Sequence, residues 1–91
     1  MAKYMVERSL PGLSGDQLAA AAAKAKLTTA EMSRQGVPVR YLRSTFVPGE
    51  NKCYCLFEGP SAQAVREANE RAELPFERIV EAVHVASEDV G

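Results

Sequence analysis

Two cysteines and one histidine are the side chains best suited to bind a metal ion. Cys53 and Cys55 are separated by one residue in the segment KCYCLFEGP at residues 52–60. In a strand they would share one face, with Cα atoms about 6.5–7 Å apart, at the upper limit for a disulfide. Two thiolates and an imidazole can hold a soft divalent ion such as nickel or zinc. Cys53, Cys55 and His84 are therefore the predicted metal ligands. The alternatives are that both cysteines are buried apolar residues and that His84 is a solvated strand histidine.

Charged and hydroxyl side chains within the expected strands form a second candidate site. Carboxylates beside an arginine can bind a small polar ligand, and carboxylates alone can bind a hard cation, while tyrosine hydroxyls can orient a ligand. The alternative is a salt-bridged interface between two chains. No serine–histidine–acid set, glycine-rich phosphate loop or zinc motif is present, so no catalytic residue is assigned. The predicted ligand-binding residues are Glu7, Tyr41, Arg43, Tyr54 and Glu58.

Size and charge restrict the class of protein. The chain has 91 residues, which predicts a single domain over residues 1–91. It has 11 Lys and Arg against 12 Asp and Glu, a net charge of −1. This balance argues against nucleic acid or an anionic membrane as the main partner. We find no apolar run of about 18 residues and no apolar signal-peptide core. We therefore expect a cytoplasmic protein with reduced thiols.

The elements that must position these residues follow from periodicity and end signals. Alternating or β-branched segments predict strands at residues 3–8, 37–47, 52–58 and 78–86. Helices are expected at residues 14–35, capped by Ser14 and stopped by Gly36, and at residues 62–72. Leu27 lies opposite the apolar stripe of the first helix, so it either contacts another chain or marks a break, since Thr28 and Glu31 have capping-box spacing. The helix surface near Asn69 and Glu73 is expected to be solvated.

The hairpin loop at residues 48–51 sets the predicted register of the central strands. It places Phe46 opposite Cys53, Ser44 opposite Cys55, and Leu42 opposite Phe57. The face with both cysteines is assigned to the helices, and the other to a partner chain or a pocket. This second face would form an exposed patch of Val39, Tyr41, Val47, Tyr54 and Leu56.

The order strand, helix, strand, strand, helix, strand predicts a ferredoxin-like α+β fold of two layers. Right-handed crossovers put the first and third strands in the centre of the sheet. Both helices then cover one face and leave the other open. Two such faces packed together would form a homodimer, a dimeric α/β barrel with a central cavity.

Four segments of the chain resemble one family of small bacterial ferredoxin-like proteins. These are KYMVERSLPG, GVPVRYLRSTFV, CYCLFEGPSAQAVREA and LPFERIVEAV. The family is classed as a domain of unknown function and includes a nickel-binding, nickel-responsive member. Its members often carry a histidine just after the triplet that is Val65-Arg66-Glu67 here, where this chain has Ala68 and Asn69. The resemblance implies the ferredoxin-like fold and nickel as the metal.

Three functions remain open from the sequence. The first is a small cytoplasmic metal-binding protein, with nickel or another divalent ion as cofactor. The second is a dimeric α/β-barrel enzyme, isomerase- or monooxygenase-like, that binds a small molecule in the sheet cavity; this rests on fold analogy. The third is a non-catalytic dimeric interaction module.

Overall fold

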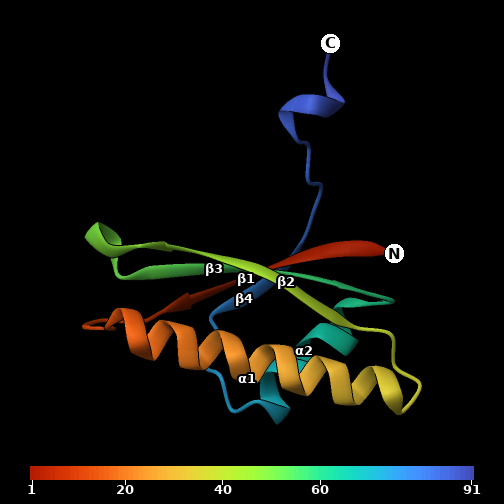
Figure 1. Ribbon diagram of the computed structural model, residues 1–91, viewed down its shortest axis with the longest axis horizontal. Helices are drawn as coiled ribbons and strands as arrows, with labels where there is room; N and C mark the ends of the chain where they lie inside the picture. Colours follow the sequence, from red (N-terminus) through yellow and green to blue (C-terminus); the bar gives the residue numbers. More distant parts are fainter.

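The segment that carries both cysteines lies in the middle of the sheet. In the computed structural model, which describes residues 1–91, it forms β3 (Lys52–Gly59). This strand pairs with β2 (Arg40–Val47) on one side and with β1 (Ala2–Ser9) on the other. A shorter strand, β4 (Arg78–Ala82), pairs with β1, giving a four-stranded antiparallel sheet of order β2-β3-β1-β4. Both helices lie on one side of this sheet (Figure 1), which confirms the ferredoxin-like α+β architecture.

The first helix, α1 (Gly15–Arg34), is continuous. At its start the Ser14 hydroxyl accepts a hydrogen bond from the Gln17 N–H, and the Gln17 side chain accepts one from the Ser14 N–H, a reciprocal cap. At its end Gly36 has a φ of +100° and the Val37 N–H donates to the Met32 carbonyl, a Schellman motif that needs glycine's conformational freedom. The helix runs through Leu27 without interruption, so the alternative of a break there is wrong. The Leu27 side chain is 71% exposed on the outer side of the helix.

The second helix, α2 (Ala62–Arg71), closes the core over β3 and β4. The Ser61 hydroxyl caps its first turn by accepting from the Ala64 N–H. The buried core lies between the helices and one face of the sheet. It contains both cysteines and consists of Tyr4, Val6, Ala25, Met32, Val39, Cys53, Cys55, Phe57, Val65 and Ala68.

A β-bulge in β2 changes which of its residues face the helices. Phe46 pairs with Cys53 and Ser44 with Cys55, as predicted, but Tyr41 pairs with Phe57 where Leu42 was expected. One extra residue at the bulge reverses the alternation beyond it. Tyr41 therefore packs edge-on against the Phe57 ring, and Val39 is fully buried. The predicted exposed patch was wrong for these two residues. Leu56 does lie on the open face but is itself buried between its neighbours.

The last strand ends earlier than predicted, at Ala82 instead of residue 86. Its pairing partner β1 begins at Ala2, and Lys3 is already paired with Ala82. Beyond Ala82, β1 offers only Ala2 as a further partner, so the ladder ends there. The residues after Ala82 form a segment with one short 3-10 turn, Ser87–Asp89, which projects from the sheet on the side away from the helices (Figure 1).

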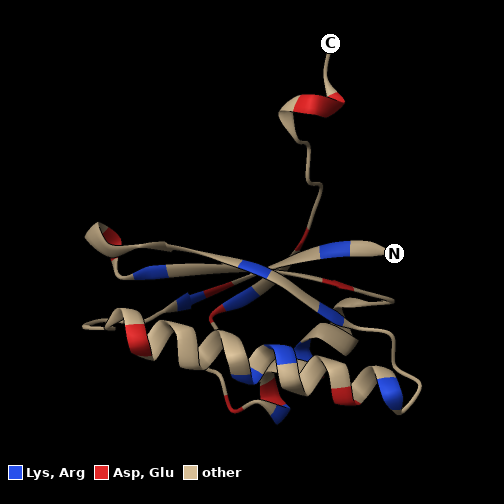
Figure 2. Ribbon diagram, in the orientation of Figure 1, with Lys and Arg blue, Asp and Glu red and all other residues tan.

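Charges of both signs are spread along the strands and helices (Figure 2). Neither α1 nor α2 has the length and apolar character that a membrane-spanning helix requires.

Candidate functional site

The two thiols lie side by side between the sheet and the helices. Cys53 Sγ and Cys55 Sγ are 3.8 Å apart, and neither is in a disulfide. Both side chains are buried, at 1% and 6% exposure. The Ser44 hydroxyl is 3.0 Å from Cys55 Sγ and 2.7 Å from the Tyr41 hydroxyl. The result is a short polar chain, Tyr41–Ser44–Cys55–Cys53, inside an apolar core.

A small pocket between α1 and the sheet is lined in part by the four residues of this polar chain. Its walls are mainly apolar, and its polar groups are the two thiols, two hydroxyls and one guanidinium. The alanines of α1 make the pocket possible because their short side chains leave room beside the sheet. The lining residues are Arg8, Leu10, Leu18, Ala21, Ala22, Ala25, Tyr41, Ser44, Cys53, Cys55 and Leu74.

Burial makes the Cys53 thiol hard to ionise. Burial, together with the neighbouring Cys55, raises the pKa of Cys53 to about 11, while Arg8 acts in the opposite direction. Burial likewise raises the pKa of Tyr41. Both observations favour the protonated forms at neutral pH. A metal ion bound by these thiols would therefore have to displace protons.

Arg8 is the guanidinium in this pocket, and it is only 2% exposed. It donates to the Pro75 carbonyl (2.9 Å) and to Asn69 Oδ1 (2.8 Å). Asn69 is buried too and donates in turn to the Val65 carbonyl (2.8 Å). The expectation of a solvated surface at Asn69 was therefore wrong. Both acceptors of Arg8 are neutral, and no carboxylate forms an ion pair with it.

Sequence reasoning missed this arginine as a site residue. The available signal was its alternation with Tyr4 and Val6, which places Arg8 on the same face of β1 as two core residues. Its acceptors are 61 and 67 residues away along the chain, so no local sequence pattern predicts them.

His84 is not beside the thiols. It follows the end of β4, is exposed, and its Nδ1 lies 2.8 Å from an Arg43 guanidinium nitrogen. Because arginine only donates hydrogen bonds, Nδ1 is the acceptor and a neutral ring carries its proton on Nε2. Arg43 is adjacent to Ser44 in β2 and points to the opposite face. The chain has no group of three or more His, Cys, Asp or Glu side chains placed to hold a metal ion, so the predicted set of Cys53, Cys55 and His84 is not assembled.

The predicted ligand-binding residues are divided between the two faces of the sheet. Glu7, Arg43, Tyr54 and Glu58 share the open face, as their ladder pairings require. Tyr41 lies on the helix face because of the bulge, so its assignment to the same pocket was wrong. The hypothesis of an enzyme with a sheet cavity placed Tyr41 and Tyr54 together, and they lie on opposite sides.

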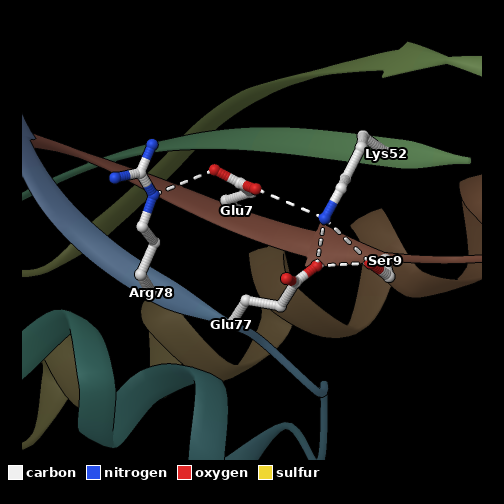
Figure 3. Close-up of polar contacts among 5 residues, drawn as sticks. All are labelled: Glu7, Ser9, Lys52, Glu77 and Arg78. Atoms are coloured by element: carbon white, nitrogen blue, oxygen red, sulfur yellow. Dashed lines mark hydrogen bonds and ion pairs between the residues drawn. The ribbon is translucent and has the colours of Figure 1, made fainter. Parts of the chain in front are cut away.

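Both carboxylates of the open face are occupied by ion pairs. Glu58 lies 3.7 Å from Lys3 Nζ and 3.6 Å from Arg40. Glu7 accepts from Arg78 Nε at 3.0 Å and lies 3.4 Å from Lys52 Nζ (Figure 3). Each therefore has two cationic neighbours, an environment that repels a further cation.

The pairs around Glu7 continue into a network at the edge of the sheet. Lys52 also contacts Glu77, and the Ser9 hydroxyl donates to the same Glu77 carboxylate (Figure 3). The hydrogen bond from Arg78 lowers the pKa of Glu7, and the one from Lys52 lowers the pKa of Glu77. In return, Glu77 raises the pKa of Lys52. These shifts match those of a surface ion-pair network.

Comparisons with known proteins agree with one another. The family model described as nickel responsive protein SCO4226-like matches residues 4–82. The crystal structure of SCO4226 from Streptomyces coelicolor A3(2) superposes with a TM-score of 0.74 at 32% sequence identity, covering 93% of this chain and 100% of that chain. No curated protein matches the chain significantly. The family match ends at Ala82, where β4 ends, so the projecting segment lies outside it.

Proposed function

The chain belongs to the nickel-responsive SCO4226-like family, and we propose from this that it is a small cytoplasmic metal-binding protein. The proposed ligands are the thiolates of Cys53 and Cys55. The family description makes nickel the first ion to test. His84, on the other side of the sheet, is not part of this proposed centre.

The observation that supports the proposal is the spacing of the two sulfur atoms. At 3.8 Å apart, two sulfurs that each lie about 2.3 Å from a common ion would subtend an angle of about 110°. This is close to the tetrahedral angle, so a chelating ion requires little movement of the strand. The pocket leaves a small space beside both sulfur atoms.

Titration calorimetry with nickel, under reducing conditions, tests the proposal. We expect wild type to bind nickel and the variant Cys53→Ser/Cys55→Ser to lose this binding, because serine hydroxyls are poor ligands for a soft ion. His84→Ala is the matched control and should bind as wild type does. Absence of heat in wild type, or equal heat in the double serine variant, would contradict a metal centre at these thiols.

We further propose that the protein forms a homodimer through the open face of the sheet. The face carries no covering element from its own chain (Figure 1). Beside it the projecting segment leaves Val83 86% exposed and Val85 63% exposed. A second copy would remove these apolar side chains from water, which is favourable in proportion to the area covered.

A further inference from the structure

The positive charge of Arg8 has no oppositely charged partner elsewhere in the fold. Its guanidinium is buried and always protonated, yet its hydrogen-bond acceptors are a carbonyl and an amide. Buried charges in proteins are normally paired, because an unpaired one loses its hydration without a compensating partner. The other arginines and lysines that form ion pairs do so on the surface. Arg8 therefore lacks a counter-charge in the state with both thiols protonated.

The groups able to become negative that line the same pocket as Arg8 are the two thiols and the Tyr41 hydroxyl. Arg8 and Cys53 are directly opposed in the β1–β3 ladder, so their side chains leave the sheet on the same face. Both residues, together with Cys55, line the same pocket. A negative charge on the two thiols would thus form next to Arg8, a cation that has no other counter-charge.

We propose that Cys53 and Cys55 bind a monovalent thiophilic cation, of the copper(I) and silver(I) class, with Arg8 as its counter-charge. This rests on the proposed function, in that it takes the thiol pair to be the metal centre. The ion displaces two protons and forms two metal–sulfur bonds: M⁺ + 2 RSH gives [M(SR)₂]⁻ + 2 H⁺. No electron is transferred.

The net charge of the metal–thiolate complex distinguishes a monovalent ion from a divalent one. A monovalent ion with two thiolates carries one negative charge, which Arg8 neutralises inside the core. A divalent ion with two thiolates is neutral and leaves Arg8 unpaired. The number of ligands agrees, because the pocket offers two sulfurs and no carboxylate or imidazole. Thiolate ligands favour copper(I) together with zinc and iron–sulfur clusters, so the charge of the complex is what distinguishes a monovalent ion here.

The spacing along β3 favours a bridging ion over a disulfide. Residues two apart in a strand have Cα atoms about 6.5–7 Å apart, at or beyond the usual limit for a disulfide, whose sulfurs are about 2.0 Å apart. An ion held linearly by two bonds of about 2.3 Å needs a sulfur separation of about 4.6 Å, so the two sulfurs, 3.8 Å apart, would have to separate by about 0.8 Å, far less than the approach to about 2.0 Å that a disulfide requires.

Competition titrations with silver(I), nickel(II) and zinc(II) on the reduced protein test the proposal, with copper(I) supplied from a colorimetric chelator as a fourth probe. We expect one silver or copper(I) ion per chain, at least a hundredfold tighter than nickel or zinc, and lost in Cys53→Ser and in Cys55→Ser. Binding of all four ions that is equal in wild type and serine variants would reject the metal centre itself, and with it the proposed function.

Variants at Arg8 test the counter-charge separately. Arg8→Met should weaken silver binding at least tenfold and leave zinc binding equal or tighter, whereas Arg8→Lys, which keeps the charge, should retain the preference for silver. Asn69→Asp adds a carboxylate next to Arg8 and should, like Arg8→Met, reduce the preference for silver over zinc. If circular dichroism shows that Arg8→Met does not fold, Asn69→Asp serves as the test in its place. A silver-to-zinc affinity ratio that is unchanged in the folded variants would overturn the proposal while leaving the metal centre intact.

Discussion

At the scale of single residues, Glu7 links the ion pairs of the open face. Arg78 and Lys52 hold its carboxylate charged, and this is why its pKa is lowered. A group with a lowered pKa in the folded state stabilises the fold above its unfolded pKa, and this contribution disappears as the pH falls through its folded pKa. Lys52 has a raised pKa, so its contribution is instead lost at alkaline pH. The network should therefore be stabilising between these two limits.

We expect Glu7→Gln to lower the urea midpoint of unfolding at pH 7, because the neutral amide gives up both ion pairs. The difference from wild type should shrink as the pH falls below about 4, where the unfolded carboxyl is protonated, and it should also shrink in high salt. Urea unfolding across this pH range measures the effect. Glu50→Gln, at an exposed turn residue without an ion pair, is the control. A difference that grows in acid would refute the assignment.

At the scale of secondary structure, the bulge in β2 decides the composition of the core. With one residue more than a regular ladder requires, β2 presents Ser44 and Phe46 to the helices on one side of the bulge and Tyr41 on the other. Without the bulge, Val39 and Tyr41 would face the open side. The Tyr41–Ser44 hydrogen bond, and with it the polar chain to the thiols, depends on this extra residue.

Deletion of Leu42 should be tolerated, at a cost of no more than about 1–2 kcal/mol, since it removes the extra residue and leaves a regular ladder in which Val39 and Tyr41 still face the helices. Leu42→Ala keeps the residue count and should cost no more than about 1–2 kcal/mol, because Leu42 is partly exposed. Urea unfolding followed by tyrosine fluorescence gives both values. A deletion variant that is less stable than Leu42→Ala by about 3 kcal/mol or more would contradict the assignment of Leu42 as the extra residue.

Much of this fold could be predicted because its signals are local. Ser14 and Gly36 mark the ends of α1, and the hairpin loop fixes the pairing of Phe46 with Cys53. The bulge could not be predicted, because VPVRYLRSTF is apolar at alternate positions in either register. The end of β4 depends on where β1 begins, and the burial of Arg8 depends on acceptors in distant segments. The thiol pair could be found by spacing, but its separation from His84 follows from these long-range features.

At the scale of the whole molecule, the two sides differ in what they leave exposed. The helix side is closed except for Leu27 on the outer surface of α1. The open side carries Val80, beside Met5 in the ladder, and the projecting segment. Exposed apolar side chains that cluster on one face indicate an interaction surface, whereas single ones do not.

Light scattering of the purified chain should give twice the chain mass of 9.9 kDa. Val80→Glu should shift the protein toward monomer, because it places a charge in the proposed interface. We expect it to raise the dimer dissociation constant at least tenfold. Leu27→Glu introduces the same charge on the helix side and should leave the dimer intact. A monomeric wild type, or a dimer broken by Leu27→Glu alone, would rule out an interface on the open face.

The pairing of Lys3 with Ala82 has a topological consequence. It brings the beginning and the end of the folded part of the chain to the same corner of the sheet, in neighbouring antiparallel strands. A turn of two residues between Ala82 and Ala2 would close the backbone into a ring. New termini could then be opened in the exposed hairpin at Pro48–Glu50, giving a circularly permuted protein in which every strand keeps its neighbours.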